Sequence, residues 1–147
     1  MPMSGSADLR QAIQSELARE AGTDADAKAL AAAALRVSDA LGGQLAVLIG
    51  AGGVRALAAR SLHIVQRPFP WLAEAQRSAP PDGPFAQLAF CMERQEPSVA
   101  AEAAAAVLAT LAGLLVTLIG ETLTMGVLRA AWPSVFPNET QQEARSR

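Results

Sequence analysis

One uncharged run places the main constraint on how this chain can fold. Residues 103–120 read AAAAVLATLAGLLVTLIG and lie between Glu102 and Glu121. The run is long enough to cross a bilayer as one helix, since a span needs about 17–25 apolar residues. It is equally typical of a fully buried helix at the centre of a soluble bundle. The two interpretations predict different compartments and different partners.

Composition predicts an all-α protein. Hydrophobic residues make up 51% of the 147-residue chain, but aromatic residues only 4%. Much of the apolar content is alanine, the strongest helix former, and residues typical of strands never alternate over a useful length. We therefore expect one helical-bundle domain of about four to five helices over residues 1–137, followed by a disordered polar tail over residues 138–147.

Local signals place the first helices. Apolar residues at helical spacing predict a helix from Ser6 to about Ala21 and a second one after a capping box at Thr23–Asp26. Five glycines interrupt the second helix, at positions 42, 43, 50, 52 and 53. Each costs about 1 kcal/mol relative to alanine inside a helix. We expect either a helix break near Gly50 or a neighbouring backbone packed closely against these glycines.

The remaining elements follow from prolines and apolar spacing. The helical pattern over residues 54–67 stops before a proline, and residues 79–84 form a loop. A short helix is predicted over residues 85–94, and one long, largely buried helix over residues 97–131. Three aromatic residues at helix ends are expected to cap the core: Phe69, Trp71 and Trp132.

The last helix carries a row of small residues beside its leucines. The row consists of Ala106, Thr110, Gly113, Thr117, Gly120 and Thr124. Small residues at this spacing allow a second helix to approach closely. The row predicts a contact with a protein partner or with another copy of the chain more directly than a contact with lipid.

Three features favour the buried helix over a membrane span for residues 103–120. The flanking Glu102 and Glu121 hold the run near the lower length limit for a span. No cluster of basic residues adjoins the run, and Arg129 follows it only nine residues later, so the charge pattern that orients a span is missing. The earlier helices also have apolar stripes that need a partner. We expect a cytoplasmic protein; the alternative is a single-pass protein of the inner or plasma membrane.

Several functional classes find no support. The net charge of −2 does not indicate nucleic acid binding. The single Cys91 cannot form an internal disulfide and fits a reducing compartment. His63 is the only histidine, and neither metal-ligand spacing nor a nucleophile–base pair is present. We expect no metal, no cofactor and no enzymatic activity.

Two segments still carry candidate binding chemistry. Residues 49–54, IGAGGV, resemble the start of a phosphate loop, but helical periodicity precedes them and no βαβ unit follows. We interpret them as a helix break or as close helix packing through glycine; an anion near Arg55, at the restarted helix, is the alternative. Arg60, His63 and Arg67 share one helix face, which is either an anion-binding face or an ordinary solvated one.

Glu121 is the most unusual single residue, since it falls at a seven-residue spacing in an otherwise apolar row. A buried carboxylate needs a partner. We hypothesise that Glu121 pairs with Arg55 or Arg60; the alternative is an edge position beside solvent. Taken together, these patterns favour a non-enzymatic interaction or regulatory module that associates through its small-residue face. A membrane-anchored protein and an anion- or small-molecule-binding bundle are the two alternatives.

Overall fold

The all-α prediction is confirmed. The computed structural model describes residues 5–24, 26–73 and 84–133, and these residues form five helices and no strand. The predicted tail at residues 138–147 and most of the predicted loop at residues 79–84 lie outside the described residues. The helices are α1 (Gly5–Ala21), α2 (Ala27–Val65), α4 (Pro84–Met92), α5 (Pro97–Ile119) and α6 (Glu121–Ala131).

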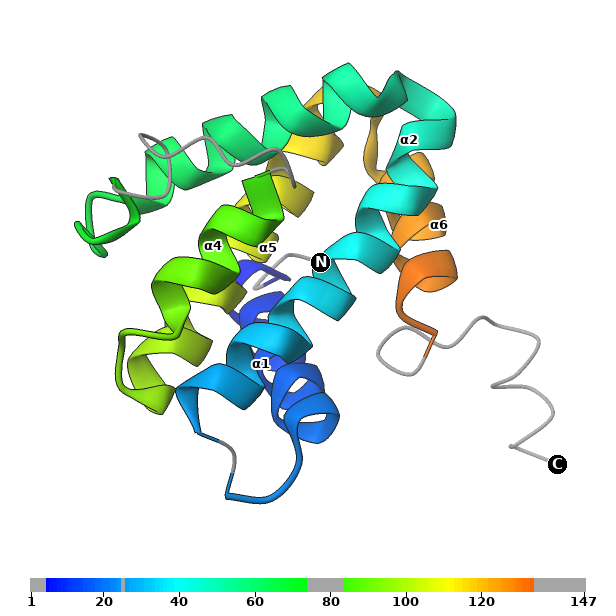
Figure 1. Ribbon diagram of the computed structural model, residues 1–147. Coiled ribbons are helices and arrows are strands. Elements are labelled where there is room, and N and C mark those ends of the chain that lie inside the picture. Colours follow the sequence, from blue (N-terminus) through cyan, green and yellow to red (C-terminus); the bar gives the residue numbers. More distant parts are fainter. Residues whose placement is uncertain (1–4, 25, 74–83, 134–147) are drawn as a thin grey trace, which may run out of the picture.

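Helix α5 is the centre of the bundle and contacts all four other described helices. The first half of α2 rises beside α1, and its second half crosses the top of the molecule in Figure 1. Helix α4 lies in front of α5, and α6 descends beside the first half of α2. The bend of α2 and the start of α6 lie at the same upper end of the molecule in Figure 1.

The uncharged run supplies the core, but only over its first two-thirds. Every residue from Ala103 to Leu108 is at most 1% exposed, and Leu111 and Leu115 are fully buried. The small alanine side chains let neighbouring helices approach closely. From Val116 onward α5 emerges from the bundle, since Val116, Thr117 and Leu118 are exposed. The predicted burial of this segment is thus confirmed for one part and not for the other.

Two glycines break helices that the sequence pattern would otherwise continue. Gly50 bends α2 with φ 79° and ψ 162°, and Gly120 separates α5 from α6 with φ 90° and ψ 160°. These angles lie in a region that is accessible essentially to glycine alone. Of the two alternatives offered by the glycine-rich segment, the structure shows the helix break near Gly50. The prediction of one continuous helix over residues 97–131 is wrong, because the backbone conformation of Gly120 cannot be part of a helix.

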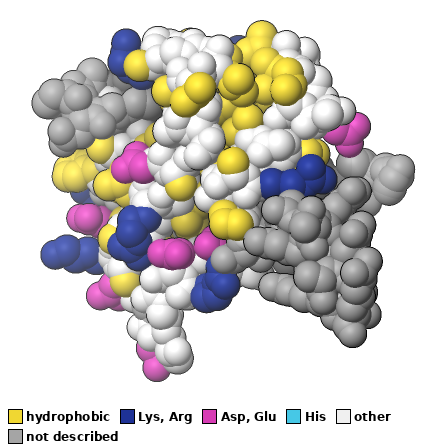
Figure 2. Space-filling view, turned by 90° about the vertical axis from the view of Figure 1, so that its right-hand side faces the viewer, with side chains coloured by type: hydrophobic (Ala, Val, Ile, Leu, Met, Phe, Trp, Pro, Cys, Tyr) yellow, Lys and Arg dark blue, Asp and Glu magenta, His cyan; other side chains and the backbone are white. Residues whose placement is uncertain are grey.

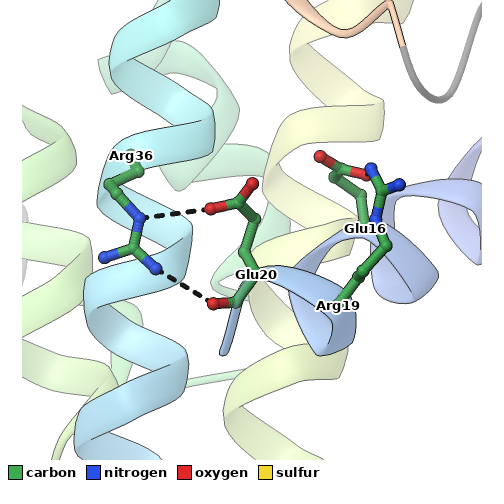
Figure 3. A network of polar contacts seen from close by, with 4 residues as sticks. All are labelled: Glu16, Arg19, Glu20 and Arg36. Carbon is green, nitrogen blue, oxygen red and sulfur yellow. Dashed lines mark hydrogen bonds and ion pairs between the residues drawn. The ribbon is translucent and has the colours of Figure 1, made fainter. Parts of the chain in front are cut away.

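The turn between α1 and α2 is fixed by polar contacts. Asp26 is the N-cap of α2, and its carboxylate accepts a 2.8 Å hydrogen bond from the main-chain N–H of Ala29. The predicted capping box beginning at Thr23 is therefore three residues early. Arg36 of α2 contacts Glu20 of α1 twice, through the carboxylate at 3.2 Å and through the main-chain carbonyl at 3.1 Å (Figure 3).

Aromatic residues close the bundle at two helix ends, as predicted. Trp132 is 3% exposed, and its indole N–H donates a 3.0 Å hydrogen bond to the carbonyl of Val37 in α2. Phe69 and Trp71 are half-buried and meet edge to face, with ring centres 6.3 Å apart. The bond from Trp132 joins the end of α6 to the first half of α2.

Candidate interaction surface

Exposed hydrophobic side chains gather around the two glycine breaks. Seven large hydrophobic residues are exposed in the described part of the chain, and five of these lie within four residues of Gly50 or Gly120. We call these five residues the apolar edge: Val47, Leu48, Val116, Leu118 and Leu123. Figure 2 shows hydrophobic side chains gathered along the upper part of the face that contains the bend of α2. We treat the five residues as one candidate surface, because the bend of α2 and the start of α6 lie at the same end of the molecule (Figure 1).

The breaks are alike in sequence as well as in backbone conformation. Each glycine follows a leucine and an isoleucine, as Leu48-Ile49-Gly50 and Leu118-Ile119-Gly120. In both tripeptides the isoleucine packs against the core, while the leucine is exposed, by 50% for Leu48 and 59% for Leu118. Each break therefore turns one large side chain inward and leaves its neighbour in solvent.

Open space surrounds both glycines. A Cβ atom placed on Gly50 or on Gly120 would meet no atom of another residue within 4 Å. Glycine is therefore needed at these positions for backbone conformation and not for close packing. Gly53 differs, because a Cβ there would lie 3.0 Å from the side chain of Ile49. The IGAGGV segment is accounted for as a helix bend with a closely packed inner side.

The predicted row of small residues is only partly accessible. Its first and last members, Ala106 and Thr124, are each 1% exposed and lie inside the bundle. Gly113, Thr117 and Gly120 are exposed, and the Thr117 hydroxyl donates to the carbonyl of Gly113 at 3.4 Å. The sixth member, Thr110, is half-buried. The accessible middle of the row thus adjoins Val116 of the apolar edge along α5.

Two charged residues of opposite sign follow the breaks along the chain. Arg55 comes five residues after Gly50, and Glu121 directly follows Gly120. Both are exposed, and the structure contains no ion pair between Glu121 and either Arg55 or Arg60. The hypothesis of an internal pair is therefore wrong, and Glu121 occupies an edge position. It lies in the first turn of α6, where a negative charge interacts favourably with the helix dipole.

The predicted cationic face is a second surface feature. Arg60, His63 and Arg67 line one shallow depression of about 690 Å³ near the end of α2, together with Ile64, Gln66 and Pro68. The Gln66 amide nitrogen lies 3.2 Å from Nδ1 of His63. Arg55 is not part of the lining. Among the described residues, the lining holds two arginines and one histidine but no carboxylate, a charge pattern suited to holding an anion.

Metal ligands do not gather in the described residues, where no group of three or more His, Cys, Asp or Glu side chains lies together. Cys91 is buried.

Two helices, α2 and α5, are long and apolar enough to cross a membrane by length and composition alone. In the most apolar 18 residues of α5, 56% of the residues are buried inside the bundle, against 28% for α2. A smaller share of the apolar window is therefore buried in α2 than in α5.

Comparisons with protein-family models, with curated proteins and with solved structures found no match to this chain. The apolar edge itself was not predicted from the sequence, where Leu45 and Leu48 have the three-residue spacing of one helix face. Leu45 is fully buried, whereas Leu48 is half exposed because α2 bends two residues later. The recurrence of Leu-Ile-Gly is the sequence signal that could have indicated two equivalent breaks.

Proposed function

We propose that this protein is a non-enzymatic interaction module that binds a protein partner through its apolar edge. The observation that carries the proposal is the concentration of exposed large hydrophobic residues around Gly50 and Gly120. Monomeric proteins seldom expose contiguous apolar patches of this kind unless the patch binds something. Covering a fully exposed valine or leucine is worth about 1.5–3 kcal/mol, so partial covering of five such residues is a substantial driving force.

The backbone at the edge favours a protein partner over lipid. Gly120 is the N-cap of α6 and has no side chain to accept hydrogen bonds from the first N–H groups of that helix. In hydrocarbon each unsatisfied N–H group would cost several kcal/mol, whereas water at the rim of a protein interface satisfies such groups. The charges nearest in sequence to the breaks, Arg55 and Glu121, are of opposite sign, and anionic lipid would favour a basic cluster.

Site-specific photo-crosslinking in cells tests this proposal. A benzophenone amino acid is placed at Leu48 or Leu118, with Phe90 as the matched control because its exposure of 54% falls between those of the two leucines. Phe90 lies in α4 and is distant in sequence from every residue of the apolar edge. Its ring contacts the guanidinium of Arg94, which lies 4.7 Å from the ring centre. We expect protein adducts from positions 48 and 118 and none above background from position 90. Adducts with lipid alone, or no adducts at all, would refute the proposal.

A second candidate function, anion binding, is favoured by the depression that Arg60, His63 and Arg67 share. Neither arginine forms an ion pair with a described residue. If the depression binds anions, millimolar phosphate raises the melting temperature of the wild-type protein, and the double substitution Arg60→Gln/Arg67→Gln abolishes the shift. The matched control is Arg129→Gln on α6, which should leave the shift intact. The same shift in the double variant would assign the effect to general salt stabilisation.

A further inference from the structure

We infer that the partner at the apolar edge is a second copy of this chain, bound about a two-fold axis. The inference rests on the proposed function, since it names the occupant of the same surface. In this arrangement the bend of α2 in one copy, with Val47 and Leu48, packs on the α5–α6 junction of the other, with Leu118. Because the contact is two-fold, the reciprocal contact forms as well.

The charges that follow the breaks are complementary to those of another copy. Residues 40–54 and 103–120 contain no charged side chain, and the first charges after them are Arg55 and Glu121. One is positive and one negative, both are exposed, and neither forms an ion pair with a described residue. In the proposed arrangement, Arg55 of each copy pairs with Glu121 of the other. The contact therefore pairs two opposite charges for which the described residues provide no ion pair.

Other occupants fit these observations less well. A strongly acidic or basic partner would leave either Arg55 or Glu121 facing a like charge. An anionic membrane surface would meet the same obstacle at Glu121. The edge also contains two similar elements, because Gly50 and Gly120 share both their backbone conformation and the preceding Leu-Ile. In the two-fold contact, the bend at Gly50 of one copy packs on the similar junction at Gly120 of the other.

The edge consists of only five large side chains, which indicates a reversible dimer and not an obligate one. Sedimentation equilibrium of the full chain, from about 1 µM to about 1 mM, covers the range in which contacts of this size dissociate. We expect the weight-average mass to rise from the 15.2 kDa of one chain toward twice that value. The variant Leu48→Gln/Leu118→Gln should remain a monomer throughout, while the matched control Phe90→Gln should dimerise as the wild type does.

Charge reversal tests whether Arg55 of one copy pairs with Glu121 of the other. Arg55→Glu or Glu121→Arg alone turns two attractive pairs into two repulsive ones and should raise the dissociation constant about tenfold. The double variant Arg55→Glu/Glu121→Arg restores opposite charges and should return it to near the wild-type value. Circular dichroism of each variant establishes that the helices are intact.

A wild-type protein that stays monomeric to about 1 mM would overturn the inference, as would equal effects of single and double reversal. The proposed function is tested separately, by the identity of the crosslinked partner. Crosslinks from positions 48 and 118 to a different protein would exclude the second copy as partner and leave the interaction surface standing. Crosslinks of doubled chain mass support both.

Discussion

The indole nitrogen of Trp132 lies 3.0 Å from the carbonyl oxygen of Val37, which is 95 residues earlier in the chain. This buried hydrogen bond joins the end of α6 to the first half of α2. Gly120 is the N-cap of α6 and the first half of α2 ends at Gly50, so the bond joins the two helical segments that adjoin the breaks. The position of the apolar edge therefore depends on a contact at the opposite end of α6.

Trp132→Phe tests the contribution of this bond. The substitution removes the N–H donor and part of the buried ring, so we expect the free energy of unfolding to fall by about 1–3 kcal/mol. Trp71→Phe is the control, because Trp71 is only half-buried. Urea unfolding followed by circular dichroism measures both variants. If Trp132→Phe lowered the free energy of unfolding no more than Trp71→Phe does, the hydrogen bond would contribute little to stability.

Two glycines, Gly113 inside α5 and Gly120 at its C-cap, should respond in opposite ways to the same substitution. Gly113 is an exposed residue inside the helix, and a Cβ there meets no atom within 4 Å. Gly113→Ala should raise the free energy of unfolding by about 0.5–1 kcal/mol through helix propensity. Gly120 has equally open surroundings but φ 90°, so Gly120→Ala should lower it by about 1–3 kcal/mol.

Thermal melting of these two variants in dilute solution tests why α5 ends at Gly120. It distinguishes a requirement for the backbone conformation of glycine from a lack of space for a side chain. Gly50→Ala should behave like Gly120→Ala, because Gly50 has φ 79° and the same open surroundings. If alanine at position 120 were as stable as glycine, a continuous helix would be accessible to the chain. The two-break description of the edge would then be incorrect.

The contact between α1 and α2 predicts an asymmetry between its two members. Arg36 binds both the carboxylate and the main-chain carbonyl of Glu20, as Figure 3 shows. Glu20→Gln leaves the carbonyl contact in place, whereas Arg36→Met removes both contacts. Because the pair is exposed, we expect at most about 0.5 kcal/mol for the former and about 1 kcal/mol for the latter. Equal losses in urea unfolding would mean that the carbonyl contact contributes nothing.

Asp39 should give stability a weak dependence on pH. Loss of water by partial burial raises the pKa of the Asp39 carboxyl above its ordinary value of 3.8. The folded state therefore binds the proton more tightly than the unfolded chain does, and this contribution to stability is lost as pH rises through the range just above 3.8. Asp39→Asn removes the charged form, so we expect this variant to melt higher than the wild type at pH 7.

The size of that effect is limited because Asp39 remains largely exposed to solvent. We expect a fraction of a kcal/mol at pH 7 and no difference near pH 3, where the wild-type carboxyl is itself protonated. Melting temperatures of both proteins at the two pH values provide the measurement. A difference that persists unchanged at pH 3 would assign the stabilisation to packing or hydrogen bonding of the amide and not to charge.

Much of the fold was accessible from sequence because alanine content and apolar spacing act locally. These signals predicted the all-α class, the break near Gly50 and the burial of the run up to Leu115. The aromatic caps also followed from their positions at helix ends. Each of these features depends on residues that lie close together along the chain, so their chemistry can be interpreted without the tertiary structure.

The surface features could not be obtained in the same way. Periodicity continues across residue 120, and only the backbone angles of Gly120 show that α5 ends there. Leu48 has the spacing of a core residue, but the bend at Gly50 leaves it without a neighbouring helix to cover it. The predicted pairing of Glu121 failed for a related reason, since the direction of a side chain after a break depends on tertiary geometry. The meeting of two breaks on one edge is likewise a property of the packed bundle.

The central claim is that the chain folds as a bundle on its own and that its apolar edge binds protein and not lipid. Vesicle flotation combined with detergent-free size exclusion and light scattering tests it most directly. We predict that the full chain elutes without detergent as discrete species of one and two chain masses, and that it stays at the bottom of a gradient containing anionic vesicles. A chain that needs detergent to remain in solution, or that floats with the vesicles and loses this behaviour on Leu48→Gln/Leu118→Gln substitution, would contradict the account.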